Sequence, residues 1–257
     1  MEITFLGTGT SHGVPVIGCT CPVCLSSDPR NKRLRTSIHI LTPEISLMVD
    51  TTPDFRFQCL REGINHVDAV LYTHSHVDHI LGFDDLRRFC EMENKSIPVY
   101  GSERTLTDLA RVFQYAFDGS ARYANYVRPD PKLLAGPFSI GDLEVTPVEL
   151  PHGRMVTNGF VFTKSGKRMF AYFTDCASVP AEAEEAALDV DVLVIDALRQ
   201  NSHQTHFTIA GAIEAARRIR AKKTYLIHMC HEVAHEETES LLPSDIKLTY
   251  DGLRLEF

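Results

Sequence analysis

The stretch Thr73-His74-Ser75-His76-Val77-Asp78-His79 carries three imidazoles and one carboxylate within six positions. It follows the apolar run Ala69-Val70-Leu71-Tyr72, which predicts a strand over 69–73. Imidazole nitrogens and carboxylate oxygens suit a borderline cation such as zinc. On an extended strand end, His74 and His76 point the same way, whereas Asp78 and His79 lie beyond it, where we expect the chain to turn. The segment therefore predicts the beginnings of two adjacent metal sites.

Three more ligand-type residues each follow an apolar run of β type. His152 comes after residues 145–150, Asp175 after 169–174, and His228 after 225–227. A single residue of this kind is usually an ordinary polar group at a strand end. Three of them beside the first cluster predict that distant parts of the chain complete one metal centre.

With these residues the chain resembles the metallo-β-lactamase superfamily of binuclear metallohydrolases, from Met1 to the terminal strands. The resemblance implies one α/β domain over residues 1–257, an αββα sandwich of two mixed β-sheets packed face to face with helices outside. It implies two divalent active-site metals, zinc or manganese. One metal would be held by His74, His76 and His152, the other by Asp78, His79 and His228, with Asp175 bridging the two.

Asp50, at the end of residues 47–49, resembles the superfamily's group that orients a ligand imidazole. A turn or cap residue is the equal alternative for this position.

Composition and charge narrow the class of protein. The chain has 257 residues, with 44% hydrophobic and 23% charged residues, as in ordinary globular proteins. No apolar run approaches the roughly 20 residues of a membrane span, and the start does not resemble a signal peptide. We therefore expect a cytoplasmic protein without membrane contact, whose seven cysteines are thiols or ligands. The net charge of −8 disfavours extended nucleic-acid binding but does not exclude a small phosphate ester.

Apolar periodicity predicts most of the secondary structure. We expect helices over 54–63, 83–91, 103–117, 180–187, 208–221 and 235–241. We expect strands over 2–6, 36–41, 46–50, 69–73, 97–100, 143–150, 157–163, 168–174, 191–196, 224–228 and 247–256. Residues 118–136, rich in Gly and Pro, predict a loop, which could form a rim of the site or a homodimer contact.

Cys19, Cys21 and Cys24 place three thiols within six residues. Three thiolates and one imidazole make a closed tetrahedral site, so we predict one structural zinc. His231 is the preferred fourth ligand because it lies three residues after His228; Cys230 and then His235 are the alternatives. A reduced loop cluster or a redox group are the other interpretations. Cys59, Cys90 and Cys176 are expected to be buried apolar residues.

The cysteine loop after Gly7-Thr8-Gly9-Thr10-Ser11-His12-Gly13-Val14-Pro15 resembles the phosphoribosyl 1,2-cyclic phosphate phosphodiesterase branch of the superfamily. A similar loop occurs in a pyrroloquinoline-quinone biosynthesis relative that has lost much of the ligand set. The complete set here favours hydrolysis of a small cyclic or ribose-linked phosphodiester by a metal-bridging hydroxide.

The resemblance also implies catalytic residues. His206 stands in a segment that resembles the H-x-T segment of phosphodiesterase members, and Asp196 is where relatives place its acidic partner. Asp78 would serve both metal and catalysis. A surface His near a helix cap is the alternative for His206. His12, Arg154 and Arg199 could contact substrate phosphate, or could be turn and solvated residues.

Two other functions remain open. A tRNA 3′-processing nuclease of the ribonuclease Z type shares the ligands, but the arginines of residues 101–136 (Arg104, Arg111, Arg122 and Arg128) alternate with Asp108, Asp118 and Asp130 and form no basic arm. A cofactor-biosynthesis protein that binds without hydrolysis should hold fewer than two active-site metals.

Overall fold

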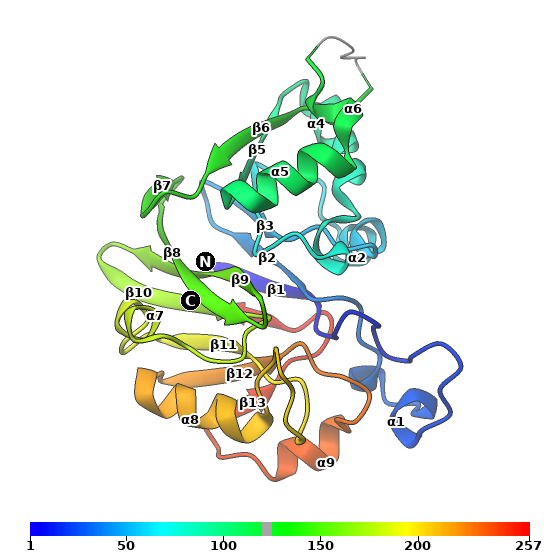
Figure 1. Ribbon diagram of the computed structural model, residues 1–257, viewed down its shortest axis with the longest axis vertical. Helices are drawn as coiled ribbons and strands as arrows, with labels where there is room; N and C mark the ends of the chain where they lie inside the picture. The colour runs from blue at the N-terminus through cyan, green and yellow to red at the C-terminus, as the bar shows by residue number, and fades with distance from the viewer. Residues whose placement is uncertain (120–124) are drawn as a thin grey trace.

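Two β-sheets packed face to face form the centre of the protein, and helices cover both outer surfaces (Figure 1). The computed structural model describes residues 1–119 and 125–257. Within these residues each sheet has seven strands, of mixed direction. The predicted αββα sandwich is confirmed.

The first sheet has the strand order β14 (Arg254–Glu256), β1 (Glu2–Gly7), β2 (Ser37–Leu41), β3 (Ser46–Val49), β4 (Ala69–Leu71), β5 (Ile97–Gly101), β6 (Pro129–Leu133). The second has the order β13 (Ile246–Leu248), β12 (Lys223–Ile227), β11 (Val192–Asp196), β10 (Lys167–Phe173), β9 (Met155–Lys164), β8 (Leu143–His152), β7 (Phe138–Ile140).

The helices are short and lie mostly between strands. Their bounds are α1 (Pro22–Leu25), α2 (Phe55–Glu62), α3 (Val77–Ile80), α4 (Arg87–Glu93), α5 (Glu103–Val112), α6 (Gln114–Phe117), α7 (Ala181–Ala186), α8 (Ile209–Ile219) and α9 (His235–Ser240), with 3-10 turns η1 (Pro29–Asn31) and η2 (Phe83–Leu86).

Side chains that alternate along the central strands form two apolar layers, one between the sheets and one under the helices. In β10, Phe170 and Tyr172 pack between the sheets, whereas Ala171 and Phe173 face the helices α7 and α8. Side chains of a strand point alternately to its two faces, so a continuous apolar strand is buried on both. The first sheet is covered in the same way by α2, α4 and α5.

The topology gathers strand ends at one edge. Strands β3, β4 and β5 run parallel, as do β10, β11 and β12. Parallel strands present their carboxyl ends together, and the residues that follow them meet there. Asp50, Asp175 and His228 follow β3, β10 and β12, and all three have left-handed backbone, with φ of 64°, 53° and 65°.

Some predicted boundaries were wrong. Residues 247–256 form two strands in different sheets, since a turn near Gly252, with φ of 88°, lets β13 join β12 and β14 join β1. The loop predicted over 118–136 contains β6, which pairs with β5; residues 120–124, Arg122 included, lie outside the described residues. Residues 83–91 and 103–117 each divide into two helical segments.

Candidate metal centre

The first sheet contributes the histidine-rich segment. Strand β4 ends at Leu71, not at residue 73, so His74 and His76 lie in the following loop. His76 is the residue before α3, and Asp78 and His79 stand on that short helix, where we had expected only a turn. A turn of helix replaces the extended strand end, and the segment still divides into two ligand groups.

The second sheet contributes the rest. His152 ends β8, Asp175 lies two residues beyond β10, and His228 follows β12 directly. The predicted distal residues therefore lie on the same edge as the first cluster.

The ligand atoms fall into two groups around one carboxylate. Those of His74, His76 and His152 lie within 4.8 Å of one another, and so do those of Asp78, His79, Asp175 and His228. Asp175 lies between the groups: its Oδ2 is 4.0 Å from Nε2 of His74 and 3.2 Å from Nε2 of His228. Its Oδ1 is 3.4 Å from Nε2 of His79.

Hydrogen bonds made by Nδ1 of two histidines determine which ring nitrogen faces the candidate metal centre. His79 donates from Nδ1 to Asp50 at 2.7 Å, and His152 donates from Nδ1 to the carbonyl of Thr205 at 2.9 Å. In the neutral form of each ring, the nitrogen without a proton is therefore Nε2, which faces the other ligands. Asp50 also accepts the backbone N–H and the hydroxyl of Thr73, both at 2.8 Å. The sequence did not predict that Thr73 and the carbonyl of Thr205 take part in these hydrogen bonds.

The buried nitrogen atoms of the centre fit a cation. Within the described residues, Nε2 of His74, His79 and His228 is buried without a hydrogen-bond partner. Burial lowers the pKa of His74, and it lowers that of His228 to about 3, so both rings are neutral with free lone pairs. Burial opposes protonation of His79 too, but the carboxylates of Asp175, Asp78 and Asp50 raise its pKa. Such a donor set attracts positive charge, and imidazole with carboxylate suits divalent zinc or manganese.

His206 and Asp196 form a pair beside these ligands. His206 donates from Nδ1 to Asp196 Oδ2 at 2.6 Å, and its ring stacks on that of His228 with centroids 4.7 Å apart. Burial alone would lower the pKa of His206, but the charge of Asp196 and this hydrogen bond raise it to about 9. A cationic His206 therefore holds a proton on Nε2.

A cleft of about 350 Å³ opens onto the centre. Asp78, His152, Asp175, His206 and His228 line it together with Ser11, His76, Arg154, Met155 and Thr205. The structure thus places Arg154 at the cleft. Ser11 and Met155 gave no signal in the sequence.

The three clustered thiols meet His231. Its Nδ1 lies 3.2, 3.5 and 3.6 Å from the Sγ atoms of Cys19, Cys21 and Cys24. Cys230 does not join this group; its Sγ accepts the N–H of Glu232. Backbone and thiol hydrogen bonds, led by the N–H of Cys24, lower the pKa of Cys21 to about 6, so a thiolate is available as a ligand. Cys59, Cys90 and Cys176 are buried as expected.

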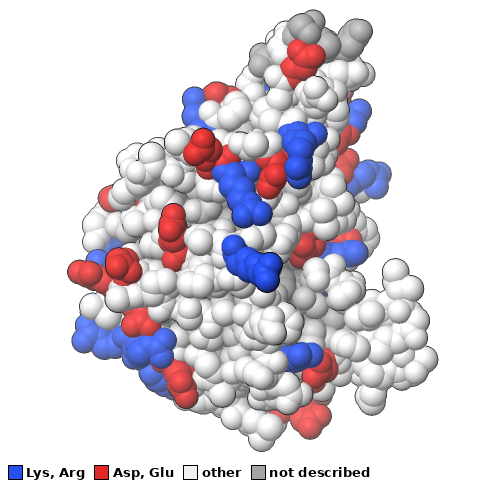
Figure 2. Space-filling model, viewed as in Figure 1, with Lys and Arg blue, Asp and Glu red and all other residues white. Residues whose placement is uncertain are grey.

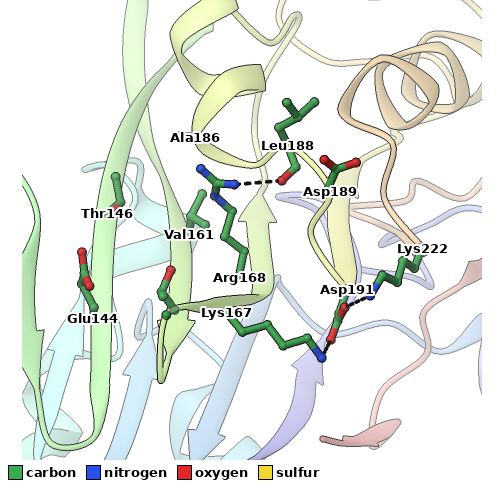
Figure 3. Close-up of a pocket in the computed structure, with 12 residues that line it drawn as sticks. Glu144, Thr146, Val161, Lys167, Arg168, Ala186, Leu188, Asp189, Asp191 and Lys222 are labelled. Atoms are coloured by element: carbon green, nitrogen blue, oxygen red, sulfur yellow. Dashed lines mark hydrogen bonds and ion pairs between the residues drawn. The ribbon is translucent and has the colours of Figure 1, made fainter.

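A larger cavity, of about 610 Å³, lies at the opposite ends of the same strands (Figure 3). It includes Lys167 at the start of β10 and Asp191 and Lys222 just before β11 and β12. Both lysines pair with Asp191, and Arg168 donates to the carbonyl of Leu188. These charges neutralise one another, and the cavity holds none of the predicted ligands.

On the face shown in Figure 2, lysines and arginines are interspersed with aspartates and glutamates among the described residues, without a continuous basic band. None of the helices in the described part of the chain has the length and apolar character that a membrane crossing requires.

A family model described as a beta-lactamase superfamily domain matches residues 46–229. The chain belongs to the metallo-β-lactamase superfamily, as its ligand-type residues predicted. A solved structure described as a new diphosphatase from the PhnP family is 40% identical, with a TM-score of 0.91, and the match covers 100% of this chain and 97% of that one.

Two sequence relatives carry other names. An octanoyltransferase of Porphyromonas gingivalis strain W83 is 37% identical over 98% of this chain, but this chain spans about half, 51%, of that relative. A coenzyme PQQ synthesis protein B of Methylorubrum populi strain BJ001 is 30% identical over 76% of this chain and 72% of that relative. The fold and the donor set together indicate a metal-dependent hydrolase that uses divalent metals.

Proposed function

We propose that residues 1–257 form one catalytic domain, a binuclear phosphodiesterase that hydrolyses a small cyclic or ribose-linked phosphodiester. The observation that carries the proposal is the convergence of six candidate ligand residues from both sheets on a seventh, Asp175, with imidazole nitrogens around it that have no hydrogen-bond partner among the described residues. The likeness to a PhnP-family diphosphatase supports phosphoryl chemistry.

His74, His76 and His152 would hold one divalent metal and Asp78, His79 and His228 the other, with Asp175 shared. When bound, the pair would neutralise charge on the phosphoryl oxygens and acidify water. Cys19, Cys21, Cys24 and His231 would hold a structural zinc.

The protein's own groups would orient the substrate and move protons. The carboxylate of Asp78 lines the cleft and can accept a hydrogen bond from the attacking water. His206 can donate its Nε2 proton to the departing oxygen while Asp196 holds the imidazolium in place.

Metal analysis combined with a substrate panel tests the proposal. The panel contains a chromogenic phosphodiester, its monoester, 2′,3′-cyclic nucleotides, phosphoribosyl 1,2-cyclic phosphate and a tRNA precursor. An octanoyl thioester is added because of the Porphyromonas relative. We expect two active-site metals per chain, beside the zinc of the cysteine site, and turnover of small diesters. Turnover of only the tRNA or the thioester would overturn the proposal, and fewer than two active-site metals would favour a binding protein.

A further inference from the structure

Helix α5 is hydrogen-bonded to the histidine-rich segment through one side chain. Ser75, which stands between His74 and His76, donates from its hydroxyl to Oδ2 of Asp108 at 2.7 Å. Asp108 lies on α5, which packs on the outer surface of the first sheet (Figure 1). The sequence indicated only a negative charge among arginines at this position. In the structure, Asp108 links an outer helix to the loop that carries two candidate metal ligands.

His76 is the histidine of this segment whose ring lacks a hydrogen bond. Nδ1 of His74 lies 3.0 Å from the hydroxyl of Thr73, and Nδ1 of His79 donates to Asp50 at 2.7 Å. The ring of His76 has no hydrogen-bond partner among the described residues and packs against the ring of His74, with centroids 4.5 Å apart. The position of His76 therefore depends on the backbone that carries it.

Helix α5 gives Asp108 a fixed support. It begins with a cap, in which the hydroxyl of Ser102 accepts the backbone N–H of Thr105 at 3.2 Å. Leu109, the residue after Asp108, is buried in the core under the helix. A side chain that is hydrogen-bonded on a packed helix has little freedom, so Asp108 restrains Ser75 and the backbone on either side of it.

Two arginines lie beside Asp108, but at longer distances. Nε of Arg104 is 4.0 Å from Oδ2, and a terminal nitrogen of Arg111 is 3.4 Å from Oδ1. Both arginine side chains are exposed, so water screens these ion pairs and they contribute little. The bond from Ser75 is the short, directed contact of this carboxylate, and hydrogen bonds to charged groups are stronger than those between neutral groups.

Building on the proposed function, we propose that Asp108 is a positioning residue of the metal centre, which holds His76 in place through Ser75. Asp108 would contact neither the ions nor the substrate. Asp50 would support the His79 side of the centre and Asp108 the His76 side. Loss of the bond between Ser75 and Asp108 should therefore weaken the binding of the ion that His76 holds.

Competition for zinc between the protein and a chelator tests the assignment without measuring turnover. In Asp108→Ala and in Ser75→Ala, we expect one active-site ion to bind about five- to tenfold more weakly, and the other to stay within about twofold of wild type. The double variant should lose no more than either single variant, because both substitutions remove the same bond. Asp50→Ala should mainly weaken the other ion.

Two further variants separate the hydrogen bond from charge and from helix stability. In Asp108→Asn the amide oxygen can still accept from Ser75, so the zinc affinity should stay within about twofold of wild type. Ser102→Ala removes the cap of α5 and should lower Tm without changing the zinc affinity. If Ser102→Ala weakens zinc binding as much as Asp108→Ala does, only the stability of α5 matters and the assignment is wrong.

Unchanged zinc affinity in both Asp108→Ala and Ser75→Ala would also overturn the assignment. The proposed function would stand in that case, provided that the wild type binds two active-site ions and hydrolyses small diesters. If the wild type binds fewer than two active-site ions, the proposed function fails and this assignment with it.

Discussion

The imidazolium of His206 and the carboxylate of Asp196 form a buried pair at the edge of the centre. Neither is needed to complete the two ligand groups, so proton transfer and metal binding can be separated by mutation. We expect His206→Ala to lower kcat about a hundredfold, while metal content stays at the wild-type value. Steady-state rates and elemental analysis on the same preparations measure both.

His66→Ala removes an imidazole from the surface and is the matched control. If the metal is lost together with the rate in His206→Ala, the residue acts as a ligand and its assignment as a proton donor is wrong.

Asp50 orients His79, one of the proposed metal ligands, by accepting a hydrogen bond from its Nδ1. Its buried carboxylate accepts three hydrogen bonds, one from His79 and two from Thr73. Removal of such a partner typically costs about 10- to 100-fold in metal affinity. We expect this loss for Asp50→Ala, measured by competition with a chelator, and a smaller loss for Asp50→Asn, which can still accept from Nδ1 of His79. Equal affinities in all three proteins would contradict the assignment.

The residues that cluster at this edge could be predicted because each is of a metal-binding type and follows an apolar run or stands in the segment just after one. The groups that orient them could not. Asp50 is equally well explained by a turn, and the carbonyl of Thr205 is a backbone group without a side-chain signal. Only the fold brings it 2.9 Å from His152.

Among the elements, the cysteine loop projects from the body of the sandwich and carries α1 (Figure 1). It is anchored to the segment after β12 through His231, while buried Arg33 donates to the carbonyls of Cys230 and Val233 at 3.3 and 2.9 Å. The loop therefore supports the chain segment that also carries His228.

If the cysteine loop holds a structural zinc as proposed, loss of one of its thiols should lower the stability of the protein. For Cys21→Ser we expect Tm to fall by on the order of 5–10 °C, since an ion at a hundred times its Kd contributes about 2.7 kcal/mol and each kcal/mol shifts Tm by about 2–4 °C at this size. Differential scanning calorimetry measures it, with Thr20→Ser as the control in the same loop. An unchanged Tm together with unchanged zinc content would rule out the cysteine site.

The apolar pattern of the sequence predicted most of the strands, but it did not predict which strands pair with one another. Residues 247–256 show one continuous strand pattern, yet β13 and β14 join different sheets. Similarly, β6 begins at Pro129 and contains a second proline, which disfavours a strand, but it pairs with β5 at the edge of its sheet, where missing N–H groups are tolerated. Pairing between distant segments decides both cases.

At the scale of the whole molecule, the candidate metal centre lies where the two sheets meet. The first sheet contributes the candidate ligands that follow β4, and the second contributes those at the ends of β8, β10 and β12. Because each proposed metal has ligands from both sheets, bound ions would bridge the halves of the sandwich. We expect the free energy of unfolding to rise by about 1.4 kcal/mol per bound site for each tenfold increase in free zinc above Kd. Thermal unfolding in a series of zinc buffers measures this slope. A Tm independent of zinc across the series would mean that the ligands do not act as a cation site.

His228 and His231 stand on one short segment, three residues apart, and belong to different clusters. Thermodynamic reciprocity then applies to their ions: if filling the cysteine cluster tightens the catalytic pair by some factor, filling the catalytic pair must tighten the cysteine cluster by the same factor. Under zinc scarcity such a molecule would tend toward two populations, fully loaded and empty, rather than many partly loaded ones.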